Sequence, residues 1–202
     1  LANSSQEDGF GTIDTIANIE GVEGTKYDDI IFGTSGNNSL DGRKGNNTID
    51  GREGFDYIEY NGENRHNVIV DLSDGSASYT YGVNGETYQD TLFNIEGVIG
   101  SNNNDDITGD NTNNTIYGKY GEDTLRGGAG DDVIDGGSGN NTLDGGAGND
   151  IYISDGRNPG QNIITDNEGS ADTLEIVDGT GKDRLNLYVT EDSIVRESNQ
   201  GR

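Results

Sequence analysis

The chain has 202 residues, a formal net charge of −26 at pH 7, 34 glycines and no cysteine. Leu, Ile, Val and Phe total 41 residues, and at this charge such a content lies near the border of intrinsic disorder. The acidity argues against nucleic-acid binding, the lack of cysteine excludes disulfides and thiolate metal sites, and no apolar run approaches the ~20 residues of a transmembrane helix. We therefore expect the chain to need counter-ions before it can become compact.

Residues 1–23 are predicted to be a lead-in strand segment. Residues 14–33 (DTIANIEGVEGTKYDDIIFG) match residues 90–109 (DTLFNIEGVIGSNNNDDITG) at 11 of 20 places. The chain thus contains a larger duplication, in which an NIEGV motif precedes a repetitive stretch. Because Leu1 is not an initiator Met, we expect the sequence to be a piece of a longer protein.

Residues 24–59 form a first array of four nine-residue units, GTKYDDIIF, GTSGNNSLD, GRKGNNTID and GREGFDYIE. Each unit begins with glycine, has Asp or Asn at its sixth place and a large apolar residue at its eighth place. One apolar position in nine is too sparse for an amphipathic helix, whereas glycine permits tight turns and close backbone approach. Each unit is therefore predicted to be a turn followed by a short strand around the eighth place.

Residues 60–99 break the nine-residue phase and are predicted to be a β insertion. Strand-like residues recur in it at 68–72, 78–83 and 88–93. We expect a β-hairpin or small meander extruded from the repeats. Three tyrosines of this segment could form a recognition surface: Tyr79, Tyr81 and Tyr88. The alternative, which we favour, is that they cover the hairpin's own apolar face, since isolated hairpins need packing.

Residues 100–153 form a second array of six units in one phase: GSNNNDDIT, GDNTNNTIY, GKYGEDTLR, GGAGDDVID, GGSGNNTLD and GGAGNDIYI. A three-residue strand with one inward side chain cannot fold alone, so copies must stack and bury a continuous apolar row, as in a solenoid. Stacking also places the sixth-place carboxylates above one another at about the 4.8 Å strand spacing. Like charges so placed repel unless a cation lies between them, and oxygen ligands suit Ca²⁺.

The units resemble the GGxGxDxUx nonapeptides of the repeats-in-toxin (RTX, haemolysin-type) calcium-binding family. The resemblance implies an all-β fold, a parallel β-roll (β-solenoid) in which two units make one turn. It also implies several Ca²⁺ ions, each between same-side turns two units apart, with ligands from sixth-place side chains and from carbonyls of the first and third places.

The resemblance assigns candidate ligands to both arrays. In the second array these are the side chains of Asp105, Asn114, Asp123, Asp132, Asn141 and Asp150, with the carbonyls of Gly109, Gly118, Tyr120, Gly127, Ala129, Gly136, Ser138, Gly145 and Ala147. In the first array they are the side chains of Asp29, Asn38, Asn47 and Asp56, with the carbonyls of Gly33, Ser35, Gly42 and Lys44. Asn brings no charge, so mixed sites should bind more weakly. The first array, which also carries basic residues on its turns, should be the weaker binder.

Residues 154–202 are predicted to be a C-terminal β cap, because a solenoid needs its last apolar row covered. Strand-like runs fall at 162–165, 173–177, 185–189 and 193–195. Asp155, Asp166 and Asp172 could complete a terminal calcium site, although we favour a solvated acidic surface. If the two arrays form one continuous roll, Asn47 would face Asp105 and Asp56 would face Asn114.

No hydrolase nucleophile elbow, phosphate loop or zinc-protease motif is present, and the single histidine, His66, argues against zinc and against histidine catalysis. We therefore expect a non-enzymatic, calcium-binding β-roll module of a secreted bacterial protein. The resemblance implies type I secretion in an unfolded state and folding outside the cell on Ca²⁺ binding. The alternative is an accessory module of a larger secreted enzyme or adhesin, binding a polysaccharide or a cell surface through residues 60–99.

Overall fold

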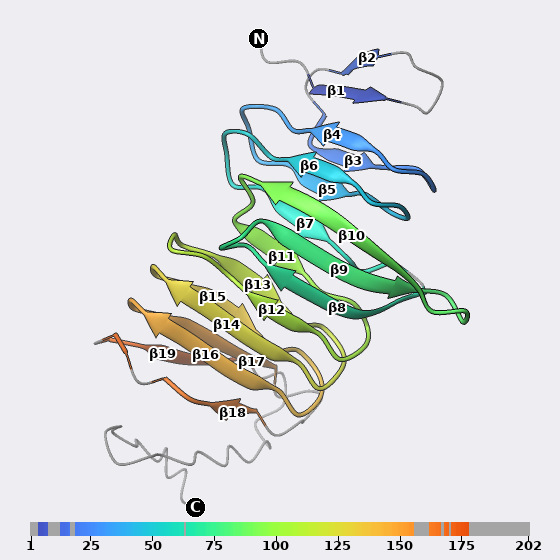
Figure 1. Cartoon of the computed structure of the whole chain (residues 1–202). Helices are drawn as coiled ribbons and strands as arrows, with labels where there is room; N and C mark the ends of the chain where they lie inside the picture. The colour runs from blue at the N-terminus through green and yellow to red at the C-terminus, as the bar shows by residue number, and fades with distance from the viewer. Residues whose placement is uncertain are drawn as a thin grey trace, which may run out of the picture.

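The computed structural model describes residues 4–7, 13–16, 19–62, 64–155, 162–166, 168–169 and 171–177. These residues form strands and no helix, so none of them lies in a helix that could span a membrane. The strands build a solenoid from two sheets that face each other (Figure 1). The predicted all-β, parallel β-roll is confirmed.

One sheet has eight strands, one for each turn of the solenoid, and all of its pairings are parallel. In order along the sheet they are β3 (Gly21–Glu23), β5 (Ser39–Asp41), β7 (Tyr57–Glu59), β11 (Gly97–Ile99), β13 (Thr115–Tyr117), β15 (Val133–Asp135), β17 (Ile151–Asp155) and β19 (Thr173–Val177). The first of them, β3, lies within the residues predicted as a lead-in.

The other sheet has eleven strands. In order they are β2 (Ile13–Ile16), β1 (Ser4–Glu7), β4 (Ile30–Phe32), β6 (Thr48–Asp50), β10 (Glu86–Phe93), β9 (Ser76–Tyr81), β8 (Arg65–Asp71), β12 (Asp106–Thr108), β14 (Thr124–Ala129), β16 (Thr142–Ala147) and β18 (Ile163–Ile164). The β1–β2 hairpin pairs antiparallel with β4 at the N-terminal end of this sheet.

The seventh to ninth places of each nonapeptide form the strand, and successive units alternate between the two sheets. Parallel pairing joins units that are two apart, so that Ile116 lies beside Ile134 and Leu125 beside Leu143. The eighth-place side chains fill the core and are at most 2 % exposed: Ile31, Leu40, Ile49, Ile58, Ile107, Ile116, Leu125, Ile134, Leu143 and Tyr152. Each such buried side chain stabilises the stack by about 1.5–3 kcal/mol.

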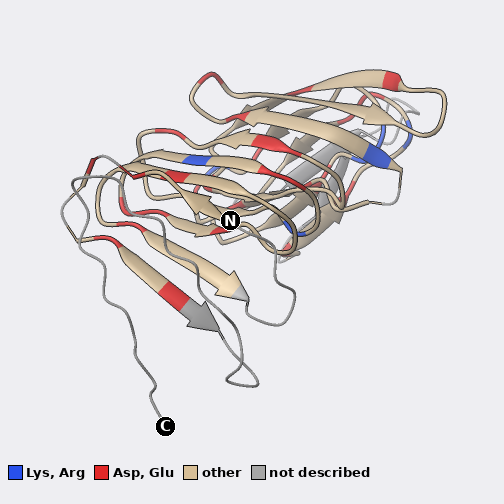
Figure 2. Cartoon of the chain, turned by 90° about the horizontal axis from the view of Figure 1, so that it is seen from below, with Lys and Arg blue, Asp and Glu red and all other residues tan. Residues whose placement is uncertain are grey.

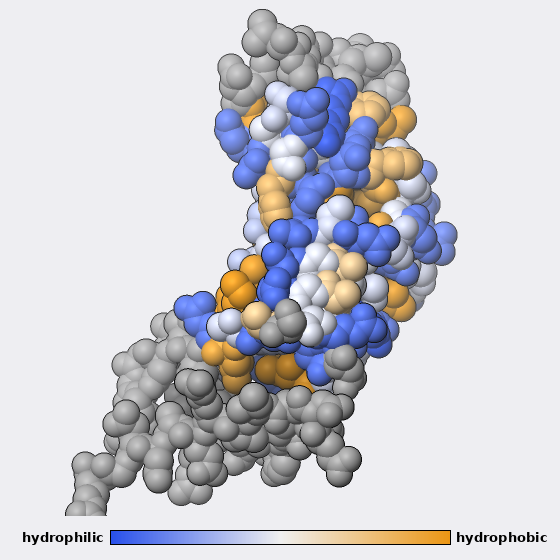
Figure 3. All heavy atoms as spheres, turned by 90° about the vertical axis from the view of Figure 1, so that its left-hand side faces the viewer, coloured by the Kyte–Doolittle hydropathy of each residue, from blue (hydrophilic) through white to orange (hydrophobic). Residues whose placement is uncertain are grey.

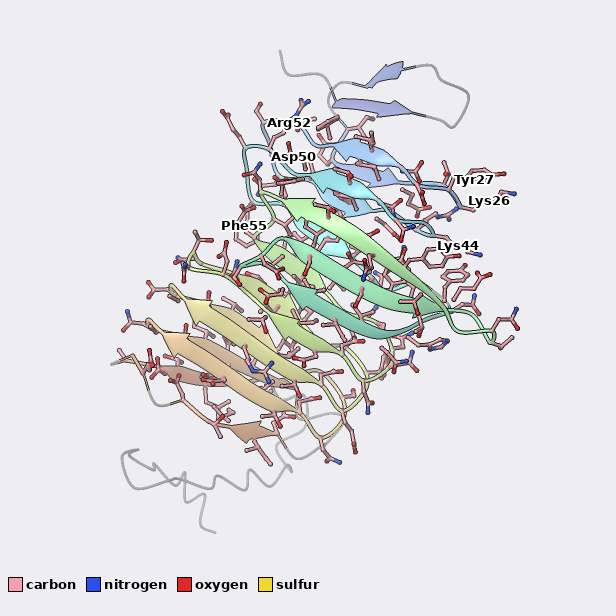
Figure 4. The ribbon with its side chains drawn as sticks, in the orientation of Figure 1. Lys26, Tyr27, Lys44, Asp50, Arg52 and Phe55 are labelled. Carbon is pink, nitrogen blue, oxygen red and sulfur yellow. The ribbon has the colours of Figure 1, made fainter. Side chains whose placement is uncertain are left out.

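The glycine-rich turns alternate between the two edges of the roll. Figure 4 shows Lys26, Tyr27 and Lys44 on one edge and Arg52 and Phe55 on the opposite edge. We call these the Lys44 edge and the Arg52 edge. The Lys44 edge holds turns 24–29, 42–47, 100–105, 118–123 and 136–141. The Arg52 edge holds turns 33–38, 51–56, 109–114, 127–132 and 145–150.

The insertion is an antiparallel meander of β8, β9 and β10. The prediction that this segment is extruded from the repeats is wrong. The meander lies within the eleven-stranded sheet, because β8 pairs in parallel with β12 and β10 pairs in parallel with β6. Three strands therefore lie where a regular roll would have one, and they carry the eleven-stranded sheet across the gap between the arrays. On the other sheet, β11 bridges β7 and β13, so the roll is continuous.

A buried arginine fastens the meander to the first array. Arg65 is 2 % exposed and its Nη2 lies 2.5 Å from Asp41 Oδ1, while its Nη1 donates to Glu59 O at 2.9 Å. The guanidinium also lies 5.4 Å from the ring centre of Tyr60 and 5.2 Å from that of Tyr79. This side chain supplies a fixed positive charge to turn carbonyls and a carboxylate inside the roll.

The insertion tyrosines pack against the roll. Tyr79 is 1 % exposed and its hydroxyl donates to Arg43 O and Gly45 O at 2.7 and 3.0 Å. The ring of Tyr88 lies 5.8 Å from that of Tyr79, and Tyr81 and Tyr88 are both half-buried. These contacts agree with the covering role that we favoured over a recognition surface, since Tyr79 is not accessible to a partner.

The roll continues beyond the last nonapeptide. Ile164 of β18 pairs with Leu143, and Leu174 of β19 pairs with Tyr152. These segments, predicted as part of a cap, add one parallel strand to each sheet at sequence offsets of 21 and 22 residues. The predicted runs at 185–189 and 193–195 lie outside the described residues.

We predict that Arg65→Met lowers the free energy of unfolding at saturating Ca²⁺ by about 3–5 kcal/mol, because it removes the buried guanidinium that pairs with Asp41 and donates to Glu59 O. Arg126→Met is the matched control, since the Arg126–Asp106 pair is about half exposed and should contribute less than about 1 kcal/mol. Urea unfolding followed by circular dichroism measures both. Equal effects of the two substitutions would contradict this role of Arg65.

Candidate calcium sites in the turns

The sixth-place side chains form a hydrogen-bonded ladder along each edge of the roll. Asp132 N–H donates to Asp150 Oδ1 at 2.8 Å, and Asp105 N–H donates to Asp123 Oδ1 at 2.9 Å. The predicted same-side pairs are brought together in this way: Asp29–Asn47, Asn38–Asp56, Asp105–Asp123, Asn114–Asp132, Asp123–Asn141 and Asp132–Asp150. Either Asp or Asn supplies the accepting oxygen, so the ladder itself needs no charge.

The ladder crosses the insertion through two residues that sequence analysis missed. Asn47 N–H donates to Asp90 Oδ1 and Asp56 N–H donates to Glu96 Oε2, both at 2.9 Å. The expected pairs Asn47–Asp105 and Asp56–Asn114 are wrong, because β10 and β11 lie between the arrays. The repeated NIEGV motif was the available signal for Glu96, which has no place in the nine-residue phase.

Four ladder carboxylates have a second oxygen without a hydrogen-bond partner: Asp56, Asp123, Asp132 and Asp150. All four are at most 1 % exposed. Burial raises the pKa of Asp123 and of Asp132 to about 7 and that of Asp56 to about 6. A buried carboxylate oxygen without a partner is costly, and a cation beside it would remove that cost. We call these four the open turns.

Each open oxygen faces a gap beside a first-place glycine. At Gly127, an added Cβ would lie 2.6 Å from Gly145 O and closer still to Asp132 Oδ2, and the same arrangement recurs at Gly118 with Asp123. At these two glycines the sixth-place oxygen of one unit and the first-place carbonyl two units later therefore converge on one small space. In the other two open turns the second oxygen is that of the Asn94 carbonyl beside Asp56 and that of the Tyr152 hydroxyl beside Asp150. The first places require glycine because of this close approach. An oxygen-only gap of this kind fits Ca²⁺.

Four other turns close the gap with their own backbone. Thr25 N–H donates to Asp29 Oδ2 and Ser101 N–H donates to Asp105 Oδ2, both at 2.6 Å. The same bond satisfies the side-chain oxygens of Asn38 and Asn114. These are the first two units of each array, and their second places hold a short polar residue. In the open turns the second-place residues Arg52, Lys119, Gly128 and Gly146 have positive φ.

The remaining two turns place an amide nitrogen at the gap. Asn141 Nδ2 donates to Gly136 O at 3.0 Å, and Asn47 Nδ2 would lie 2.5 Å from a Cβ on Gly42. An N–H donor in this position opposes a cation. The six Asn or self-bonded sixth places thus differ chemically from the four open ones. The residue type alone reveals this difference for the four Asn but not for Asp29 and Asp105.

The predicted third-place carbonyls take part in bonds between turns. Ser138 O accepts Gly121 N–H at 3.0 Å and Ala147 O accepts Gly130 N–H at 2.7 Å. Ala129 is half-buried, and Ser35 and Tyr120 are exposed at turn tips. Lys44 forms an ion pair with Glu86 at 2.6 Å, and its Nζ lies 5.4 Å from the ring centres of Tyr81 and Tyr88. This charge makes its turn a poor place for a cation.

Acidic residues recur along the whole roll while basic residues are few (Figure 2). Figure 3, which faces the Arg52 edge, shows mainly hydrophilic residues with smaller apolar areas beside them. This edge carries three of the four open turns, with Asp56, Asp132 and Asp150. One open turn lies in the first array and three lie in the second.

Comparison with known proteins identifies the repeats. A family model described as the RTX calcium-binding nonapeptide repeat (4 copies) matches residues 23–58 and 117–152. No curated protein matches the chain. The two matched segments are RTX repeats, whose nonapeptides bind Ca²⁺, and the solenoid that they build is a calcium-binding β-roll.

We predict that Asp132→Asn weakens the apparent Ca²⁺ affinity by about tenfold or more, ~1.4 kcal/mol, because it removes a charged ligand from an open turn. Asp105→Asn should have a smaller effect, because Asp105 Oδ2 already accepts the Ser101 N–H. Calcium titration by isothermal calorimetry compares the two variants. A larger loss for Asp105→Asn would contradict the division into open and closed turns.

The raised pKa values predict an inverse pH dependence without calcium. Asp123 and Asp132 have a folded-state pKa of about 7 against 3.8 ordinarily, so the folded chain binds more protons than the unfolded chain between these values. The stability of the calcium-free roll should therefore be greatest at low pH and decrease as the pH rises through about 7. Thermal unfolding in chelator across this range measures it. Stability that instead increases with pH would contradict the prediction, and Asp123→Asn with Asp132→Asn should flatten the profile.

Proposed function

We propose that this chain is a non-catalytic module whose folding depends on Ca²⁺, in a secreted bacterial protein. The observation that carries the proposal is the set of four buried carboxylates whose second oxygens lack a partner, in a chain of net charge −26. Without a cation these charges oppose stacking, whereas the eighth-place core favours it. Ca²⁺ binding decides which effect prevails, because any ligand that binds only the folded state stabilises it.

We assign the ligand role to the open turns. The side chains of Asp56, Asp123, Asp132 and Asp150 would hold Ca²⁺, together with first-place carbonyls such as those of Gly136 and Gly145. The bound ion supplies positive charge to the gap. The other sixth places, Asp29, Asn38, Asn47, Asp105, Asn114 and Asn141, act mainly as hydrogen-bonding members of the ladder.

We propose a secreted location because a fold that depends on Ca²⁺ in the open turns suits a protein that meets high calcium only outside the cell. Extracellular calcium modules commonly bind at ~10⁻⁴–10⁻³ M, so such a roll would remain open where calcium is scarce and close where it is abundant. We propose that the chain leaves the cell unfolded by type I secretion and folds outside. The high negative charge keeps the unfolded chain expanded and soluble.

The alternative function, an accessory module that binds a polysaccharide or a cell surface within a larger secreted enzyme or adhesin, requires residues other than Tyr79. Ile69 on β8 and Phe93 on β10 are about half exposed on the outer face of the insertion. Together with Val83, which is fully exposed between β9 and β10, they are the accessible large apolar residues that such a partner would contact. Ile69→Ser with Phe93→Ser should then abolish binding to an immobilised polysaccharide without changing the calcium titration.

The test of the main proposal is far-ultraviolet circular dichroism during a Ca²⁺ titration after chelation, with Mg²⁺ as the control ion. We expect a cooperative gain of β signal with Ca²⁺ and not with Mg²⁺, because Mg²⁺ demands a tighter octahedral shell and keeps its water. A chain that is fully folded in chelator and indifferent to Ca²⁺ would overturn calcium-dependent folding.

A further inference from the structure

We propose that the last open turn, that of Asp150, forms a three-carboxylate Ca²⁺ site at the C-terminal end of the roll together with Asp166 and Asp172, two residues outside the nonapeptide pattern. One oxygen from each carboxylate lies within 4.8 Å of the other two. Two ligands of a single Ca²⁺, bound at 2.3–2.6 Å, are at most about 5 Å apart, so one ion can contact all three. The identification of the ion as Ca²⁺ rests on the proposed function, whereas the convergence of the three carboxylates is independent of it.

Asp150 distinguishes this cluster from an ordinary acidic surface. Its side chain is 1 % exposed, and its Oδ1 accepts the Asp132 N–H at 2.8 Å. Its Oδ2 is buried and has no hydrogen-bond partner. A solvated surface patch, the interpretation favoured from the sequence, would not contain a buried oxygen of this kind. A cation bound between them would stabilise the buried oxygen of Asp150 and reduce its repulsion with the two neighbouring carboxylates.

The other two carboxylates are held in place by the fold. Asp172 Oδ1 accepts the Asp150 N–H at 3.0 Å, so Asp172 continues the ladder although it lies 22 residues away instead of 18. Asp166 Oδ2 accepts the hydroxyl of Tyr152 at 2.7 Å, which ties it to the eighth place of the last nonapeptide. Both contacts bring these residues, which precede and follow the turn at Gly169, against Asp150.

The charge of the cluster predicts its rank among the calcium sites. Three carboxylates meet here, whereas a same-side pair within the arrays contains at most two, as in Asp105–Asp123 and Asp132–Asp150. Calcium affinity increases with the number of charged ligands. We therefore infer that this site binds more tightly than the array sites and that it fastens β18 and β19 to the roll.

The experiment is a Ca²⁺ titration of the full chain by isothermal calorimetry, with Asp166→Asn combined with Asp172→Asn. The double variant should lose one Ca²⁺ per chain from the tightest class and keep the weaker class. Glu168→Gln is the control for loss of charge near the site. Glu168 is exposed and contributes no oxygen to the cluster, and its substitution removes one negative charge from the same loop, against two in the double variant. A double variant with unchanged stoichiometry and tightest affinity would overturn the site, as would an equal loss in Glu168→Gln.

A second measurement, Tb³⁺ luminescence, tests the site in a variant that keeps all three carboxylates, so the result does not depend on whether the double variant folds. The chain has no tryptophan, so tyrosines alone sensitise bound Tb³⁺, and Tyr152 touches Asp166. Tyr152→Phe, which leaves all three carboxylates, should remove most of the emission from the first Tb³⁺ equivalent, and unchanged emission would overturn the site. If the wild-type chain bound no Ca²⁺ at all, the proposed function would fail. If the wild-type chain folded on Ca²⁺ and the double variant kept the same Ca²⁺ stoichiometry and the same tightest affinity, the terminal site alone would be overturned.

Discussion

The roll depends on the sixth-place side chain of each nonapeptide, whose two terminal atoms have different roles. Its first oxygen, at six of the ten sixth places, accepts a backbone N–H from the turn two units earlier and so holds successive turns in register, as between Asp132 and Asp150. Its second atom faces the gap beside a first-place glycine, and only there does Asp differ from Asn. Stacking is thus built from neutral hydrogen bonds and apolar contacts, whereas the charge in the gap is an added cost that a cation removes.

At the centre of the roll, side chains of the protein rather than an ion neutralise or hydrogen-bond the buried carboxylates. Arg65 supplies the positive charge to Asp41 and to turn carbonyls, and the hydroxyl of Tyr60 donates to Asp90 Oδ2 at 3.0 Å. Asp90 is 3 % exposed and occupies the ladder position next to Asn47. In the insertion, Arg65 and Tyr60 therefore take the place that a cation would have beside the carboxylates of Asp41 and Asp90. We propose that calcium dependence is concentrated in the flanking open turns, three of which lie in the second array.

The repeat period accounts for what could be predicted from the sequence. Eighth-place burial, including Tyr152, and the pairing of residues 18 apart follow from stacking identical units. The insertion could not be placed in this way, because its position depends on contacts such as Arg65 with Asp41 across 24 residues. The strand-like runs at 162–165 and 173–177 were predicted as parts of a cap. Their parallel pairing with the roll was not predicted, because offsets of 21 and 22 leave no regular phase to recognise.

The division into open and closed turns depends on backbone conformation at the second place. Thr25 and Ser101 direct their N–H groups to the sixth-place oxygen. Arg52 instead has a φ of 74°, and its N–H donates to Asp50 Oδ1. Arginine does not require a positive φ, so its identity does not predict an open turn, although the glycines of later units permit one. We therefore propose that the capacity of a sixth-place carboxylate to bind Ca²⁺ depends on the backbone conformation four residues before it.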